Sequence, residues 1–214
     1  MRASKLFFYV LLCLTIVLST ATPALAEGQG GDSPNPRDGE QLTFLLAEAD
    51  DTERAQIWVR LPNEEKYAVV EYNTVVKVTS EDIFISPLSG DRNTTSNILA
   101  SGCDVRGKKE KGYNVFGQVV WEYYSRVEWC YNGTNVTSKF ATRSGKPGPF
   151  PSLWEYLGDA VPPVQGGGVS QTYYRIWVNG YFKFAIAGYP IQSNYPWIDI
   201  TVRGNGTNTA SSGQ

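Results

Sequence analysis

The sequence predicts an all-β protein, a mainly antiparallel β-sandwich of about ten strands with one short helix and one disulfide. Between residues 41 and 204, β-branched and aromatic side chains dominate, and turn signals containing Gly, Pro or Asn recur about every ten residues. One stretch, residues 115–131, alternates apolar and polar side chains as a half-buried antiparallel strand does. Two cysteines within the same region fit a single disulfide.

Residues 1–26 are predicted to be a signal peptide. Arg2 and Lys5 precede an apolar run over residues 6–18, and a cleavage site rich in small side chains ends at Ala26. The run is shorter than the roughly 20 residues that span a bilayer, so we expect a cleaved leader rather than a membrane anchor. The mature protein is then secreted and extracellular, with no membrane span after signal cleavage.

Three parts are expected after the signal peptide. Residues 27–40 are rich in Gly, Pro and Asp and nearly lack apolar side chains, which is typical of a flexible leader. Residues 41–204 are expected to form a single β-sandwich domain, because a chain of this length supports one ordinary core. Residues 205–214 are polar and contain several Gly and Ser residues, which predicts a flexible tail.

The first strands are expected where short apolar runs alternate with turn signals. The segment that follows them, residues 100–112, is basic and contains several glycines, so we expect it to be irregular. The predicted strands before it are residues 41–46, 56–61, 66–72 and 75–80.

The alternating stretch 115–131 is the longest predicted strand. All its charged residues fall on even positions and therefore share one face. Its extended length would be about 56 Å, so we expect a bend or bulge near residues 124–125. A two-residue turn at Asn132–Gly133 should then pair Trp129 with Val136. The buried face is expected to carry Trp121, Tyr123, Ser125, Val127, Trp129 and Tyr131.

Cys103 and Cys130 are predicted to form a disulfide. The third cysteine, Cys13, lies in the predicted signal peptide, and an isolated pair in an exported chain most often forms a bridge. In the chain-entropy model, closing this loop contributes about 3 to 4 kcal/mol. A redox role is not expected, because the pair lacks the CxxC spacing.

The one predicted helix lies in the Pro- and Gly-rich connection that follows. Within residues 151–159, Ser152 and Glu155 have the spacing of a capping box, and Gly158 would end the helix.

The next predicted element is a hairpin over residues 172–188. Asn179–Gly180 suits a two-residue turn that needs positive φ at both positions. In the last predicted strand, residues 196–204, the apolar residues alternate with Trp197, which therefore lies on the polar face. The turn would place Tyr173, Trp177, Phe182, Phe184 and Ile186 on the buried face of the hairpin.

The chain contains no histidine. The chain therefore cannot use Ser-His-Asp or Cys-His catalysis, and it cannot form a zinc site that contains histidine. Its acidic residues lack the spacing of a calcium loop, so we expect no metal site. We also expect no cofactor and no catalytic residue. The formal net charge of −2, with basic residues spread thinly, gives no reason to expect a nucleic-acid partner.

Aromatic residues on loops and on the last strand are the candidates for a binding site, because aromatic rings stack on sugar faces. The alternative is that Trp197 packs beneath a loop and that Trp154 anchors the predicted helix, since large aromatic side chains are mostly buried. The expected ligand-binding residues are Trp154, Tyr156, Tyr189, Tyr195, Trp197, Asp199 and Arg203.

Three functions fit these features. The first is a non-enzymatic extracellular protein that binds a glycan or a cell-surface partner. The second is a glycan-cleaving enzyme with two carboxyl groups roughly 5 to 9.5 Å apart, for which the scattered acids provide candidates. The third is a structural protein-interaction module, suggested by the acidic excess in residues 27–95 and the basic excess in residues 96–214. The candidate acids are Glu122, Glu128, Glu155, Asp159 and Asp199.

From "NVFGQVVWEYYSRVEWCYNGTNVT" through "YPWIDITVRGNG", the chain resembles secreted bacterial proteins of uncharacterised function. These proteins carry a Leu-Gly or Phe-Gly strand, a Trp-Cys-Tyr-(Asp/Asn)-Gly hairpin and a closing Tyr-Pro-x-Ile strand. The resemblance covers residues 97–206. It implies a secreted β-sandwich and brings no catalytic residues with it.

Overall fold

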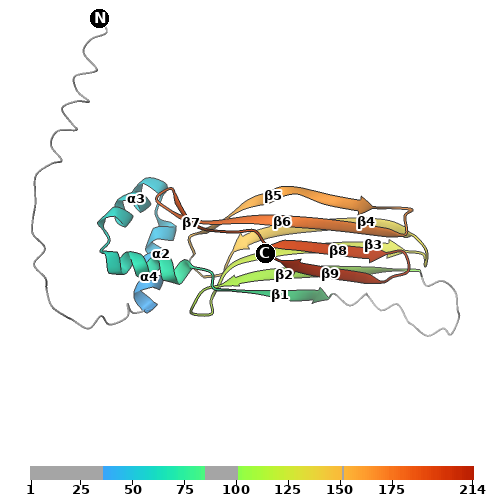
Figure 1. Cartoon of the computed structure of the whole chain (residues 1–214), viewed down its shortest axis with the longest axis horizontal. Helices are drawn as coiled ribbons and strands as arrows, with labels where there is room; N and C mark the ends of the chain where they lie inside the picture. The colour runs from blue at the N-terminus through green and yellow to red at the C-terminus, as the bar shows by residue number, and fades with distance from the viewer. Residues whose placement is uncertain (1–35, 85–100, 151) are drawn as a thin grey trace, which may run out of the picture. The chain divides into compact units, whose positions relative to one another are not determined.

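The computed structural model describes residues 36–84, 101–150 and 152–214 (Figure 1). The predicted signal peptide and most of the predicted leader lie outside the described residues. Within the described ranges, no helix is long and apolar enough to cross a membrane. Three helices come first, α2 (Pro36–Glu48), α3 (Asp51–Arg60) and α4 (Asn63–Asn73). The strands are β1 (Lys77–Phe84), β2 (Gly102–Tyr113), β3 (Val119–Tyr131), β4 (Val136–Pro147), β5 (Trp154–Gly167), β6 (Tyr173–Ile186), β7 (Tyr189–Asn194), β8 (Trp197–Arg203) and β9 (Asn208–Gly213).

The strands form two antiparallel sheets. One sheet has the order β1-β2-β3-β4, and the other has the order β5-β6-β8-β9 with β7 paired to β6 (Figure 1). Trp121 of β3 stacks on Phe182 of β6 with ring centroids 4.9 Å apart, so the apolar faces of the two sheets pack against each other. The prediction of a mostly antiparallel β protein is confirmed. The described residues hold nine strands and three helices, whereas about ten strands and one helix were expected.

The prediction from alternation is confirmed for β3. Trp121 is 0% exposed and Trp129 is 1% exposed, and Tyr123, Ser125 and Val127 on the same face are also buried. The expected bulge near residues 124–125 is wrong, because β3 pairs without interruption with both neighbours there. The register shifts instead at the ends of the strand pairs, where fewer cross-strand bonds resist it.

The connection after β3 is longer than the predicted two-residue turn. Tyr131, rather than Trp129, pairs with Val136, and Trp129 pairs with Lys139. The side-chain oxygen of Asn132 accepts hydrogen bonds from the backbone N–H groups of Thr134 (3.1 Å) and Asn135 (2.8 Å). This local bonding stabilises a wider loop over residues 132–135, and the register shifts beside it.

The predicted disulfide between Cys103 and Cys130 is confirmed. The two residues are direct cross-strand partners of β2 and β3. The prediction that residues 100–112 are irregular is wrong, since Gly102–Tyr113 is strand β2. Its lysines find acidic partners on the neighbouring strands, as Lys111 does with Glu81 at 2.8 Å, so the positive charge is accommodated in the sheet.

Strand β6 is continuous where a hairpin was predicted. Asn179 pairs with Trp197 of β8, and the Gly180 N–H donates to the Pro196 carbonyl at 2.8 Å, so the chain is held straight across the Asn-Gly dipeptide. A Cβ on Gly180 would lie 2.8 Å from the Tyr123 ring of the other sheet, which explains the glycine by close approach rather than by a turn. Without the turn the parity is unbroken, so the even residues are buried and Tyr173 and Trp177 are not.

The segments predicted as strands at 41–46, 56–61 and 66–72 are helical instead. In α4 the buried residues are Ala68, Val69, Tyr72 and Asn73, which is the spacing of one helix face. Helix α3 has a capping signal that the strand interpretation overlooked: the Asp50 carboxylate accepts from the N–H groups of Thr52 and Glu53, each at 2.9 Å. The prediction at 75–80 is close to β1, which begins at Lys77.

The predicted helix at 151–159 is also wrong, because Trp154–Gly167 is strand β5. The Ser152 hydroxyl does bond to a nearby backbone N–H, that of Trp154, at 3.2 Å. Glu155, however, pairs with Lys183 of β6 rather than closing a capping box. Gly158, at φ 97°, lies where the β5–β6 register shifts, so its positive φ serves a bulge and not a helix end.

Two segments predicted to be flexible carry regular structure. Residues 36–40 of the predicted leader belong to α2, in which Leu46 and Thr43 are fully buried. Most of the predicted tail, residues 205–214, is strand β9, which pairs with β8 along its whole length. Backbone pairing to an existing strand stabilises β9 although its small polar side chains predict disorder.

A buried carboxyl group lies where β1, β2 and β9 meet. Glu110 is 2% exposed, and one of its carboxyl oxygens has no hydrogen-bond partner in the structure. The hydroxyls of Ser80 and Ser212 lie nearby and bond each other at 2.7 Å, and Lys108 bonds Ser80 at 2.8 Å. Burial raises the pKa of Glu110 above its ordinary value of 4.5, because it disfavours the charged form.

Glu110→Gln is expected to increase the free energy of unfolding at pH 7. Because the pKa is higher in the folded state, the contribution of Glu110 to stability is complete below pH 4.5 and is lost as the pH rises through the folded pKa. Glutamine keeps the shape without the buried charge, so thermal melts between pH 4 and pH 8 should show a flatter pH dependence than the parent protein. The exposed Glu155→Gln is the control. A variant of Glu110 that is less stable at pH 7 would contradict this account.

Candidate functional site

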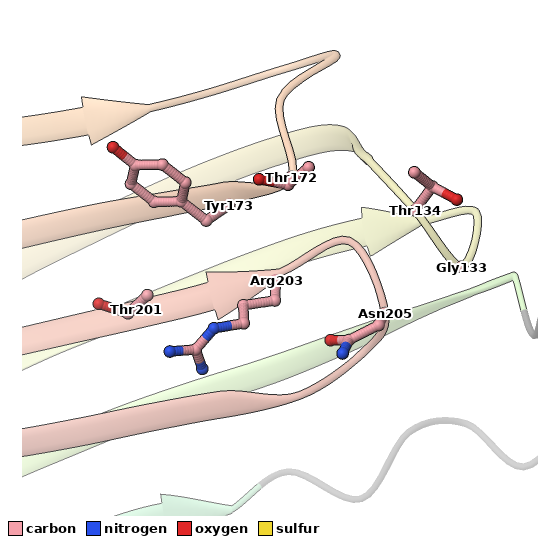
Figure 2. Close-up of a pocket in the computed structure, with 7 residues that line it drawn as sticks. All are labelled: Gly133, Thr134, Thr172, Tyr173, Thr201, Arg203 and Asn205. Carbon is pink, nitrogen blue, oxygen red and sulfur yellow. The ribbon is translucent and has the colours of Figure 1, made fainter.

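A pocket of about 510 Å³ opens among three connections at one end of the two sheets (Figure 2). The β3–β4 loop, the start of β6, and the end of β8 with the loop after it each contribute to its wall. Its lining is rich in hydroxyl and amide groups and includes one aromatic ring and one guanidinium group. The lining residues are Gly133, Thr134, Thr172, Tyr173, Thr201, Arg203 and Asn205.

Backbone hydrogen bonds tie these connections together. The Gly204 N–H donates to the Thr172 carbonyl at 2.8 Å, and the Val136 N–H donates to the Gln171 carbonyl at 2.8 Å. A Cβ on Gly204 would lie 2.1 Å from the Thr134 carbonyl oxygen, so only glycine allows this close approach. The pocket therefore has walls that are fixed by contacts between loops distant in sequence.

Side chains also shape the loops around the pocket. The Asn205 side-chain oxygen accepts from the N–H (3.1 Å) and the hydroxyl (2.7 Å) of Thr207, which stabilises the β8–β9 turn. Gly206 in this turn has φ 84°, a conformation that favours glycine. Because the carbonyl end of Asn205 is used within the turn, its amide N–H₂ group remains the donor for any ligand.

Arg203 carries the positive charge of the pocket. Its side chain is exposed, and within the described residues it makes neither a hydrogen bond nor an ion pair. Arg175 on the same sheet face is different, since its Nε donates to both carboxyl oxygens of Asp199, at 2.9 and 3.1 Å. The lining of the pocket includes no carboxylate, so Arg203 has no anionic partner within it.

Comparison with known proteins adds no relative. No family model, no curated protein and no solved structure matched the chain.

The pocket continues onto the outer face of β6 and β8. Tyr173 and Arg203 are cross-strand partners, and so are Trp177 and Asp199. Trp197 is the diagonal neighbour of Trp177 on this face. Its ring lies beside Gly213 of β9, where a Cβ would be 3.0 Å from the ring, so the glycine makes room for the indole. Aromatic side chains thus recur along the outer face, starting at the pocket.

The structure brings some of the predicted binding residues together and separates others. Trp197, Asp199 and Arg203 share the outer face of β8, and Tyr195, 47% exposed, precedes them and stacks on Tyr181 with centroids 5.0 Å apart. Tyr189 is 75% exposed but belongs to β7 and does not line the pocket.

Two predicted binding residues lie in other surroundings. Trp154 is 1% exposed, and its indole N–H donates to the Asn73 carbonyl at 2.7 Å. Tyr156 is half-buried, with its ring 5.0 Å from that of Phe182. Trp154 is therefore a core residue, as the alternative interpretation held, although it anchors a strand and not a helix.

Sequence reasoning missed Tyr173 and the threonines of the pocket. Tyr173 was assigned to the buried face because a turn was expected at Asn179–Gly180. Continuous alternation from the buried Phe182 back along β6 would have placed it outside. Thr134, Thr172 and Asn205 come from separate loops, and no local pattern indicates that these loops meet.

The candidate acids are mostly engaged in ion pairs. Asp159 pairs with Arg143, and Asp199 pairs with Arg175. Glu122 pairs with Lys146 at 3.2 Å, and Glu128 pairs with Arg126. None of the candidate acids lines the described pocket. The described residues also include no cluster of His, Cys, Asp and Glu side chains that could hold a metal ion.

Proposed function

We propose that this chain is a secreted, non-enzymatic β-sandwich protein that binds a carbohydrate. The binding site is the loop pocket together with the adjoining outer face of β6 and β8. The observation that carries the proposal is the composition of the pocket, in which an exposed tyrosine ring stands among hydroxyl, amide and guanidinium groups.

The polar lining suits a ligand with many hydroxyl groups. Thr134, Thr172 and Thr201 can each donate or accept a hydrogen bond, and Asn205 adds amide donors. Tyr173 is 41% exposed and offers an apolar ring surface beside them. A sugar ring presents the same combination, with an apolar face bounded by hydroxyl groups.

The row of aromatic residues supports an extended ligand rather than a single sugar. Tyr173 and Trp177 lie on the same strand face about 13 Å apart, and Trp197 lies diagonally across from Trp177. Rings along one sheet face can stack against successive units of an oligosaccharide. The Arg175–Asp199 ion pair lies on the same face and can bond to sugar hydroxyls.

Binding without hydrolysis fits the positions of the acids better than the glycosidase alternative. Glycosidases need two carboxyl groups directed at one bond. The ion pairs described above give Glu122, Asp159 and Asp199 structural partners. In this proposal the acids stabilise the fold and the sheet face.

Tyr173→Ala is expected to weaken oligosaccharide binding by roughly tenfold, because it removes the ring from the pocket. Glycan-array binding followed by calorimetry on the best ligand provides the measurement. Trp197→Ala should weaken binding of long oligosaccharides more than that of short ones, since Trp197 lies beyond the pocket.

Tyr67→Ala is the matched control, because Tyr67 is a 73% exposed tyrosine on α4, away from the pocket lining. Binding that survives both Tyr173→Ala and Trp197→Ala unchanged would eliminate this face as the site. A complete lack of saccharide binding by the parent protein would eliminate the function itself.

A further inference from the structure

We infer that the loop pocket selects an acidic oligosaccharide, one in which a uronate carboxylate binds Arg203. This inference rests on the proposed function and names its ligand class. The unpaired Arg203 guanidinium is the observation that distinguishes the acidic ligand from a neutral one.

The two arginines on the outer face differ in whether an acidic side chain pairs with them. Arg175 is neutralised by Asp199, through a bidentate pair between neighbouring strands. Arg203 lies two residues further along β8 than Thr201, on the same face, and no carboxylate belongs to the pocket lining. A carboxylate that enters the pocket therefore meets a positive charge without competing with an internal acid.

The donors around Arg203 match a planar anion. A guanidinium group can donate two parallel hydrogen bonds to a carboxylate, and this pairing is stronger than a bond between neutral groups. The hydroxyls of Thr201 and Thr172 and the amide of Asn205 supply further donors in the same pocket. Figure 2 shows the Tyr173 and Arg203 side chains on neighbouring strands, both extending away from Gly133 and Thr134.

The cross-strand pairing of Tyr173 and Arg203 places the two side chains next to each other where they leave the sheet. Directly opposed residues have Cβ atoms about 5 Å apart. In a hexuronate the carboxylate is attached directly to the sugar ring, so the ring can stack on Tyr173 while the carboxylate reaches Arg203. A sulfate ester on a flexible hydroxymethyl group is held less closely to its sugar ring than a uronate carboxylate is, which is why we assign a carboxylate.

The backbone around Arg203 does not depend on its side chain. Its N–H donates to the Thr207 carbonyl at 2.9 Å, and its carbonyl accepts from the Trp129 indole at 3.3 Å. Substitution of the side chain leaves these bonds in place. Arg203→Gln should therefore fold and melt like the parent protein, so a change in binding reports on the guanidinium.

The test compares binding of a tri-galacturonate with binding of its fully methyl-esterified form by calorimetry at low salt. We expect the parent protein to bind the acid at least tenfold more tightly, with the difference shrinking as salt is added. Arg203→Gln should abolish the preference, and Arg203→Lys should retain part of it. Arg60→Gln, which removes the same charge from the exposed end of α3, should leave the preference unchanged.

Each of the other possible results would contradict one specific part of the inference or of the proposed function. Equal binding of the acid and its ester, or a preference that persists in Arg203→Gln, would overturn the acidic ligand while leaving carbohydrate binding intact. A sulfated trisaccharide without carboxylates that binds as tightly as the tri-galacturonate would overturn the carboxylate assignment. If neither these ligands nor any glycan on an array binds, the proposed function fails, and this inference fails with it.

Discussion

Replacing Trp154 with alanine is expected to lower the free energy of unfolding by about 3 to 5 kcal/mol. The indole is 1% exposed, lies 5.8 Å from the Phe184 ring, and bonds the Asn73 carbonyl. Alanine leaves both a cavity and an unpaired buried carbonyl, and each is costly. Urea unfolding followed by tryptophan fluorescence or circular dichroism would measure the loss.

The effect of Trp154→Ala should extend beyond the site of substitution, because the hydrogen bonds of Asn73 join three elements. Its amide N–H₂ donates to the Thr43 hydroxyl of α2 at 2.8 Å, and its side-chain oxygen accepts from the Leu153 N–H at 3.0 Å. Loss of Trp154 therefore loosens the contact between the helices and the start of β5. We expect increased protease cleavage within α2–α4 before the sheets unfold.

Two controls separate packing from hydrogen bonding and from function. Trp154→Phe keeps most of the ring but leaves the Asn73 carbonyl unpaired, so its cost should be about 1 to 3 kcal/mol. Trp197→Ala, on the outer face, should cost much less stability while reducing saccharide binding. If Trp154→Ala keeps its stability and loses binding, Trp154 belongs to a binding site after all.

The sequence predicted β3 correctly and the helices wrongly, and both results depend on how many structures can bury the apolar residues of the segment. In β3 an apolar face alternates with charged residues over many positions, and only a half-buried strand satisfies that pattern. The α4 segment KYAVVEYN is short and has adjacent apolar residues, so both a strand and a helix can bury part of it. Contacts with α2 and β5 decide between them, and these partners are distant in sequence.

Tertiary contacts also explain why the turn predicted at Asn179–Gly180 does not form in β6. Asn-Gly is a strong hairpin signal, yet β6 has neighbours on both sides, and the Tyr123 ring occupies the space beside Gly180. This single error reversed the face assigned to Tyr173. Tyr173 of β6 was consequently left out of the predicted binding residues. On β8 the alternation of Ile198, Ile200 and Val202 correctly placed Trp197 and Arg203 on the opposite face.

Removing the disulfide by the double substitution Cys103→Ser and Cys130→Ser is expected to lower the free energy of unfolding by about 3 to 4 kcal/mol. The disulfide joins direct cross-strand partners on β2 and β3. It also reduces the number of conformations that the unfolded chain can adopt. For a protein of this size, the melting temperature should fall by about 10 °C, measured by calorimetry under oxidising conditions. Treating the parent protein with a thiol reductant should give the same decrease.

The proposed carbohydrate binding should change far less than stability in this variant. The β3–β4 loop begins close to Cys130, but it is also held by the Val136–Gln171 backbone bond and by the contact of Gly204 with Thr134. Binding measured well below the melting temperature should therefore stay within a few-fold of the parent value. A large loss of binding in a variant that is still folded would mean that the disulfide positions the pocket, and an unchanged melting temperature would mean that β2 and β3 hold their register without it.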